Sequence, residues 1–295
     1  MPADEVLLAL SERGDELRPE IVTQHGVSYS PMSASHDTAI VDALRDRARR
    51  TAENAHAPFS RRPAGAALLL ADGQWVPGAR VESASYPLTI PALLGAFVTA
   101  VAGGRRDIRA AALSRPFYPG EAAWLADALG TPAAAEAPDA AVFGTEALPH
   151  VGERWEPFAD VAEPATATAG LGLAREAAQR AVVPESNFRV GCALVAESGR
   201  VVLGCNVEFG EWTRGLCAER TALAAAAAYG AGPIRRLYLS CPADPQGTPC
   251  GACRQLLAEH AAAAPIVMDR GQAAPERTTP ADLLPQFFTG APLRL

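Results

Sequence analysis

Two short segments of the sequence carry residue types that bind metals and move protons. They are Cys217-Ala218-Glu219 and Pro249-Cys250-Gly251-Ala252-Cys253. Cys250 and Cys253 are three residues apart, so on a helix their sulfurs emerge from the same face, and Pro249 suits a helix start. Three thiolates leave one position of a tetrahedral zinc open, and an open position distinguishes a catalytic site from a structural one. We therefore predict one Zn²⁺ per chain, bound by Cys217, Cys250 and Cys253.

Glu219 lies two residues from a predicted ligand, where it can carry protons rather than bind the metal. Zinc nucleobase deaminases combine a [His/Cys]-x-Glu with a downstream Pro-Cys-x-x-Cys, and their Glu is the general acid and base. Three thiolates outweigh the charge of Zn²⁺, but helix N-termini oppose that excess, and Arg220 can donate to the sulfurs. A zinc ion so held brings the pKa of a bound water toward about 7. We predict Glu219 as the catalytic acid/base and Arg220 as an outer partner of the thiolates.

The alternative for these cysteines is a closed structural zinc site with Cys205, Cys241 or His260 as fourth ligand. A lone Cys-x-x-Cys would favour that alternative, whereas its pairing with Cys-Ala-Glu favours catalysis. A disulfide framework is not indicated, because all six cysteines follow residue 191 and most of the chain would be unbridged.

Both cysteine motifs lie at the starts of predicted helices, over 217–230 and 250–261. The residues before them predict a helix over 171–182 and two strands within 190–208 around a Ser198-Gly199 turn. Further strands are expected at 237–241 and 265–269. Strands that alternate with helices predict an α/β fold, a three-layer α/β/α sandwich.

The chain repeats itself at an offset of 126 residues. The segment from Pro58 aligns without a gap on the segment from Pro184, and the identical pairs fall mostly on Gly, Pro and Glu rather than on the abundant Ala. In the first copy Pro91 stands opposite Cys217 and Leu93 opposite Glu219, so that copy cannot bind the metal. We expect a duplicated fold with an N-terminal extension (1–35), a degenerate non-catalytic domain (36–145), a linker (146–168) and a catalytic domain (169–295).

Composition excludes several classes of function. Apolar residues make up 49% of the 295 and charged residues 20%, as in a globular protein. The net charge is −7 with no basic stripe, which argues against a nucleic acid polymer as partner. No apolar run approaches the roughly 20 residues of a membrane span, and the N-terminus lacks the pattern of a secretory signal. We expect a cytoplasmic protein that acts on a small molecule, away from membranes.

The sequence resembles the cytidine deaminase family. The matching pieces are SNFRVGCALV, GCNVE, CAERTA, PCGACRQLLAEH and LLPQFF, which cover about Ser186 to Phe288. The resemblance implies the cytidine deaminase type of sandwich, present twice, although two-domain bacterial members usually carry the catalytic copy first. It also implies substrate contacts: Asn206 and Glu208 to the ribose hydroxyls, Phe188 against the base, and the backbone N–H of Ala218 to the base. The alternative for Asn206 and Glu208 is a hairpin end with a solvated carboxylate.

Between the ribose Glu and the first Cys, family members carry a segment close to Asn-Ala-Ser-Tyr-Gly-Leu-Thr-Ile, which lines a neighbouring subunit's site. The degenerate copy keeps a similar segment over 83–90, whereas the catalytic copy has Phe-Gly-Glu-Trp-Thr-Arg-Gly-Leu over 209–216. The resemblance therefore implies that Ala84 and Tyr86 wall the active site while Trp212 faces the inactive one. Phe288 would close a site across an interface, in a homodimer of two-domain chains. The alternative is that the segment persists only as core or by slow drift.

The expected reaction is zinc-dependent hydrolytic deamination of cytidine or deoxycytidine to the uracil nucleoside with release of ammonia, in pyrimidine salvage. The first alternative is the same chemistry on a modified cytosine nucleoside in a specialised biosynthetic or resistance pathway, which the unusual segment around Trp212 supports. The second is a zinc-stabilised binding protein without turnover, against which the intact Glu219 argues.

Overall fold

The structure is a computed structural model of residues 1–295, and it describes 35–159, 161–210 and 214–293. The predicted extension, apart from residue 35, and the segment around Trp212 lie outside the described residues. Within the described ranges, no helix has the length and apolar character needed to cross a membrane.

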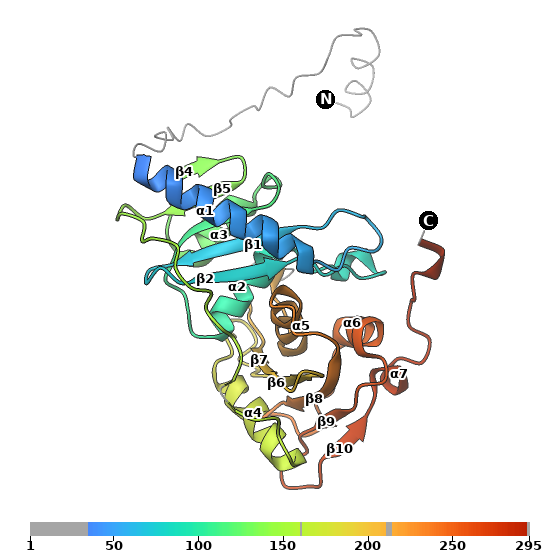
Figure 1. Ribbon diagram of the computed structural model, residues 1–295. Coiled ribbons are helices and arrows are strands. Elements are labelled where there is room, and N and C mark those ends of the chain that lie inside the picture. Colours follow the sequence, from blue (N-terminus) through green and yellow to red (C-terminus); the bar gives the residue numbers. More distant parts are fainter. Residues whose placement is uncertain (1–34, 160, 211–213, 294–295) are drawn as a thin grey trace, which may run out of the picture.

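The N-terminal copy runs as helix, hairpin, helix and strand, and then as a short helix and a second hairpin (Figure 1). Its elements are α1 (Ser35–Thr51), η2 (Ala52–Asn54), β1 (Gly65–Leu70), β2 (Trp75–Ala79), η3 (Tyr86–Leu88), α2 (Ala92–Ala102), β3 (Ile108–Leu113), α3 (Glu121–Leu129), β4 (Ala133–Ala137) and β5 (Ala140–Phe143).

The C-terminal copy repeats the first part of this order and then differs. Its elements are α4 (Ala167–Gln179), β6 (Gly191–Ala196), β7 (Val201–Cys205), α5 (Ala218–Ala228), β8 (Ile234–Ser240), α6 (Gly251–Ala261), β9 (Ile266–Met268), β10 (Glu276–Thr278), α7 (Pro280–Leu283) and η5 (Ala291–Leu293). The predicted hairpin turns at Gly199, whose φ of +82° suits glycine. The sequence patterns did not predict β10 or α7.

Each copy forms one five-stranded sheet, and the two sheets differ at one side. The first has the order β2-β1-β3-β5-β4 and the second β10-β9-β8-β6-β7. In the second sheet β9 lies parallel to β8, because α6 provides the crossover that parallel neighbours need. In the first sheet the chain leaves α3 for the edge strand β4 and returns by a hairpin, so β5 lies antiparallel to β3.

Helices cover both faces of each sheet, because side chains alternate along the strands. On β6, Cys192 and Leu194 pack in the same cluster as Ala222 of α5, whereas Ala193 and Val195 pack in another with Leu171 of α4. In the first copy α1 and α2 take the corresponding places. The expected duplicated three-layer α/β/α sandwich is therefore confirmed.

The identical glycines of the repeat mark places where a helix backbone touches a strand. A Cβ on Gly191 would lie 2.0 Å from the carbonyl oxygen of Ala174 in α4. A Cβ on Gly65 would lie 2.1 Å from the carbonyl oxygen of Ala48 in α1. Gly65 and Ala48 each lie 126 residues before their counterparts Gly191 and Ala174. Only glycine allows this approach, which explains why glycines survive in a copy that has lost its chemistry.

The two copies pack through α2 and α5, so the helix that begins at the Cys-Ala-Glu motif lies between them (Figure 1). Asn54 donates its side-chain N–H to the carbonyl of Ala228 at the end of α5 (2.9 Å). At the other end of the contact, Ser83 and the backbone N–H of Ala84 donate to the two carboxylate oxygens of Glu259 on α6, at 2.6 and 2.9 Å. The N-terminal copy thus holds both helices that carry the cysteine motifs.

Candidate active site

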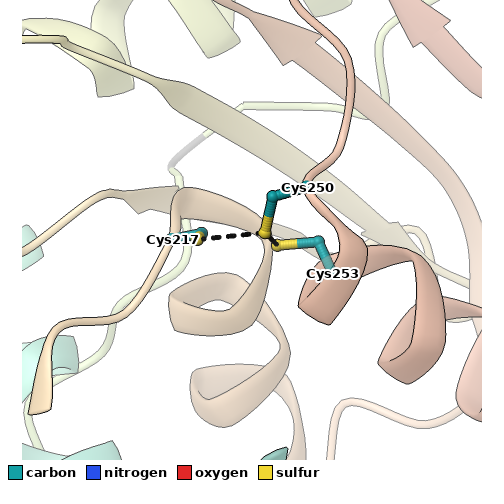
Figure 2. A group of neighbouring side chains, drawn as sticks. All are labelled: Cys217, Cys250 and Cys253. Atoms are coloured by element: carbon teal, nitrogen blue, oxygen red, sulfur yellow. Dashed lines mark hydrogen bonds between the residues drawn. The ribbon is translucent and has the colours of Figure 1, made fainter. Parts of the chain in front are cut away.

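Cys217, Cys250 and Cys253 meet where α5 and α6 begin (Figure 2). Cys217 is the N-cap of α5, Cys250 is the N-cap of α6, and Cys253 lies in the first turn of α6. The Sγ atom of Cys250 is 3.5 Å from that of Cys217 and 3.5 Å from that of Cys253. Two thiolates on one tetrahedral zinc lie about 3.8 Å apart, given a Zn–S distance of about 2.3 Å. The three sulfurs therefore fit a zinc ion.

The three thiols share their protons unequally when no metal is bound. Contacts with the Cys217 and Cys253 thiols, and then with the backbone N–H groups of Cys253 and Ala252, lower the pKa of Cys250 against the opposing effect of burial. Contact with the Cys250 thiol, together with burial, raises the pKa of Cys217 to about 12. Contacts with both other thiols, together with burial, raise the pKa of Cys253 well above its ordinary value. A thiolate is the form that binds metal, so Cys250 is the first of the three to reach that form, and metal binding must release the protons of the other two.

No fourth protein ligand completes a closed site among the described residues. The Cys, His, Asp and Glu atoms that lie within 4.8 Å of one another in a group of three or more are the three sulfurs alone. Of the alternative ligands, His260 instead packs edge-on against His56, with ring centroids 4.7 Å apart. A three-sulfur set leaves a coordination position for water or substrate, as catalytic zinc sites do.

Glu219 is buried in the first turn of α5, with 3% of its surface exposed. Burial, the largest effect, raises the pKa of its carboxyl to about 7. A carboxyl group with such a pKa can both accept and release a proton near neutral pH, which is the requirement for a general acid and base.

A cavity of about 380 Å³ opens above the cysteines and Glu219. This volume is in the range of pockets that enclose small organic ligands. Five of the predicted residues share it: Phe188, Asn206, Cys217, Glu219 and Cys250. It is also lined by Val190, Leu239, Cys241, Asp244, Gln246, Gly247 and Thr248.

The loop over 244–248 is the part of this cavity that the motif analysis missed. It leads from β8 to Cys250 and is ordered by the Asp244 carboxylate, which accepts a hydrogen bond from the backbone N–H of Gln246 (2.9 Å). The sequence contains a pattern that could have identified this loop. Its polar residues lie between the carboxyl end of a strand and a ligand motif, which is where ligands bind in open α/β sheets.

The side chains of Asn206 and Glu208 already form hydrogen bonds with other residues of the same chain. Asn206 accepts a hydrogen bond from the backbone N–H of Val190 and donates one to the carbonyl of Phe188, both at 2.8 Å, so it positions the segment that carries Phe188. Glu208 accepts from the hydroxyl of Ser186 (2.5 Å) and from two backbone N–H groups. It does not line the cavity of 380 Å³.

The degenerate copy contains the same arrangement as Glu208. Glu82 accepts hydrogen bonds from the Ser60 hydroxyl and from the backbone N–H groups of Phe59 and Ser60. A pair that is retained where no metal can bind has a structural task. Glu208 is therefore held by protein donors, as Glu82 is, which differs from the solvated carboxylate of the alternative. Its ribose contact stays a prediction.

Arg220 and Ala218 lie beside the cysteines but do not line the cavity of 380 Å³. Arg220 donates through Nη2 to the carbonyl of Leu88 in the first copy (3.2 Å), so its hydrogen bond goes to the neighbouring domain rather than to a sulfur. Ala218 is the first residue of α5 and is fully buried, with 0% of its surface exposed. The predicted roles of both residues stay predictions.

Ala84, Tyr86 and Phe288 do not line the cavity of their own chain. Ala84 is buried against α6, whereas Tyr86 points to solvent with 85% of its surface exposed. Phe288 is 49% exposed, and its backbone is held by two hydrogen bonds to the Gln255 side chain of α6. Within one chain these aromatic rings are therefore exposed rather than part of a wall.

The comparisons with family models and with individual proteins point to the same family. Two models of the cytidine and deoxycytidylate deaminase zinc-binding region match the chain, one over residues 166–268 and the other over 10–114. Cytidine deaminase of Sporosarcina psychrophila is 38% identical over 120 residues, which are 40% of this chain and 88% of that protein. Cytidine deaminase of Mycobacterium tuberculosis is 42% identical over 120 residues, 40% of this chain and 85% of that protein.

Solved structures similar to the chain carry the same name. The cytidine deaminase structure from Burkholderia pseudomallei has a TM-score of 0.40 at 38% identity, covering 42% of this chain and 99% of that one. The structure from Mycobacterium tuberculosis has a TM-score of 0.36 at 37% identity, covering 41% and 95%.

Proposed function

This chain belongs to the cytidine deaminase family, and we propose that its C-terminal copy hydrolyses cytidine or deoxycytidine to the uracil nucleoside and ammonia. The observation that carries the proposal is the juxtaposition of three thiols and a buried Glu219 at one cavity of about 380 Å³. The N-terminal copy has Pro91 and Leu93 in the corresponding positions, so we assign it no turnover.

Cys217, Cys250 and Cys253 would hold the zinc ion, which when bound supplies a Lewis acid that activates water. Glu219 then moves two protons in turn. Its carboxylate accepts the first from the water that attacks C4 and donates it to N3 of the cytosine ring. It accepts the second from the hydroxyl now bonded to C4 and donates it to the amine, whose bond to C4 breaks as the C4 carbonyl forms. One water is consumed and one ammonia is released, and Glu219 returns to its starting state. Phe188, which lines the cavity with 38% of its surface exposed, offers an apolar face for the base.

A substrate panel tests this function. The full-length zinc protein is given cytidine, deoxycytidine, their 5′-monophosphates, modified cytosine nucleosides and free cytosine, and loss of absorbance and release of ammonia are followed. We expect turnover of the nucleosides, since the cavity holds more than a base. Turnover restricted to a modified cytosine nucleoside would favour the specialised alternative. No ammonia from any substrate by a zinc-loaded protein would favour the binding protein.

We further propose that the active enzyme is a homodimer in which Tyr86 and Phe288 of one chain reach the cavity of the other. Tyr86 and Phe288 are large aromatic side chains that are exposed in the single chain, and aromatic residues are enriched at protein–protein interfaces. The segment before Tyr86 is anchored on α6 through Glu259, so its direction relative to the cysteines is set.

Tyr86→Ala is expected to raise KM or lower kcat for cytidine by roughly three- to ten-fold, since one aromatic contact to the substrate pocket is lost. Zinc content and melting temperature should not change, because the side chain is 85% exposed in the chain. Steady-state kinetics, zinc analysis and thermal unfolding provide the measurements. Tyr118→Ala is the matched control, since Tyr118 is also exposed in the first copy (51%). Equal kinetics for both variants, or full activity in a monomer, would contradict the proposal.

A cytoplasmic location and a part in pyrimidine salvage complete the proposal. All six cysteines are free in the structure, and a reducing compartment keeps thiols available for metal.

A further inference from the structure

Asp244 brings a second carboxylate, besides that of Glu219, to the wall of the cavity of about 380 Å³. The backbone fixes its place just after β8: its N–H donates to the carbonyl of Cys241, and its own carbonyl accepts from the N–H of Gly247, both at 2.9 Å. Its side chain is half-buried. The proposed deamination uses Glu219 and the three sulfurs, so it leaves Asp244 without a task.

The charge of the Asp244 carboxylate is not neutralised by the described residues. Asp244 forms no ion pair with any of them, and the hydrogen bond that it accepts comes from an uncharged backbone N–H, that of Gln246. Among the described residues, those that line the cavity include no arginine, lysine or histidine. Because a partly buried charge is screened less than one in open water, this wall attracts a cationic group and repels an anionic one.

Two arginines hold the loop over 244–248 and the residue after it, but they do not line the cavity. Nη1 of Arg270 donates to two carbonyls of the loop, each at 2.8 Å, and its Nε pairs with Glu276 at 2.9 Å. Nε of Arg254 donates to the carbonyl of Pro249 at 2.8 Å. These arginines therefore fix the position of Asp244 without offering a phosphate site in the cavity.

The proposed function leaves open which group the sugar of the substrate carries. We propose that Asp244 is a specificity-determining residue, which favours cytosine nucleosides with a cationic or neutral group at the 5′ position and rejects those with a phosphate. This inference rests on the proposed function and names the class of its substrate. Two unit charges about 8 Å apart, at an effective dielectric constant of about 20, change an affinity by roughly thirty-fold. A phosphate carries up to two such charges near neutral pH, so its affinity changes more.

The test measures binding rather than turnover. The full-length zinc protein carries Glu219→Gln, so that the ligands are not consumed, and calorimetry gives the affinities of four ligands that differ at the 5′ position. They are 5′-amino-5′-deoxycytidine, which is cationic, cytidine, cytidine 5′-monophosphate, and 5′-O-sulfamoylcytidine, which is neutral but has the shape of the monophosphate. Relative to cytidine, we expect the amine to bind at least roughly three-fold tighter, the sulfamate within about five-fold, and the monophosphate at least roughly a hundred-fold weaker.

Asp244→Asn, added to this protein, removes the charge and keeps the shape. Asparagine retains the Oδ1 that accepts from the Gln246 N–H, so the loop should keep its turn. The preference for cytidine over its monophosphate should fall at least roughly ten-fold, and the preference for the amine should disappear. Glu197→Gln is the matched control, because Glu197 is exposed in the same copy and does not line the cavity. Its replacement should leave both preferences unchanged.

Several results would overturn the proposal. A monophosphate that binds as tightly as cytidine would show that the site does not select by charge. A sulfamate rejected as strongly as the monophosphate would assign the selection to size, and preferences that stay unchanged in Asp244→Asn, or change equally in Glu197→Gln, would assign it to another group. Each of these leaves the proposed function intact if the wild-type chain turns over cytidine. A zinc-loaded protein that binds none of the four ligands would overturn this inference and the proposed function together.

Discussion

Glu219→Gln is expected to lower kcat for cytidine by about 10²–10⁴-fold, the usual contribution of a general acid and base. Glutamine has nearly the same shape as glutamate but cannot take a proton from water or return one to the substrate. The variant should keep its zinc, because Glu219 is not one of the three sulfur ligands. It should also keep its melting temperature, because glutamine fills the same buried space. Steady-state kinetics, metal analysis and thermal unfolding are the measurements.

Glu197→Gln is the matched control for the loss of one negative charge from the same copy. Glu197 is exposed in the turn between β6 and β7, so its replacement should leave kcat unchanged. A Glu219→Gln protein that retains more than about a hundredth of the wild-type kcat would mean that another group transfers the protons.

Gly204→Ala is expected to disturb the metal site from a position outside it. Gly204 is on β7, and a Cβ there would lie 2.3 Å from the carbonyl oxygen of Ala218 and 2.6 Å from the backbone nitrogen of Ala222. Both are backbone atoms, so α5 as a whole must shift. Such overpacking costs about 1–3 kcal/mol of the free energy of unfolding. It also moves Cys217, the residue before Ala218, away from the other two sulfurs.

We therefore expect Gly204→Ala to unfold at lower denaturant concentration, to hold less than one zinc per chain, and to lose most of its deaminase activity. Gly78→Ala is the matched control, because Gly78 meets the same helix atoms in the first copy: its Cβ would lie 2.1 Å from the carbonyl oxygen of Ala92. This variant should lose similar stability but keep its zinc. Full zinc and wild-type kcat in Gly204→Ala would show that α5 absorbs the methyl group without moving its first residue.

The sequence by itself determined the chemistry and the duplication. Cys250 and Cys253 are three residues apart on one helix, and Glu219 is two residues after Cys217, so their relations are local and follow from spacing. The repeat offset of 126 residues likewise identified positions such as Gly65 and Gly191. The structure shows why these glycines persist: helix backbone lies directly against them in both copies.

The tertiary structure decided which residues from distant segments meet. Cys217 and Cys250 are 33 residues apart in the sequence, and their contact depends on how α5 and α6 pack on the second sheet. The loop over 244–248 enters the cavity for the same reason. A sequence motif specifies residue types and spacing, but it does not specify where a side chain points in the folded protein.

The hydrogen-bond partners of polar side chains were also decided only by the folded chain. Glu208 turns to Ser186, and Arg220 turns to Leu88 of the other copy, because each group takes the partner that lies within reach once the backbone is placed. Tyr86 points outward because η3 lies at the surface of the single chain. These choices depend on packing between segments that are 22 to 132 residues apart, and no local pattern in the sequence encodes such distances.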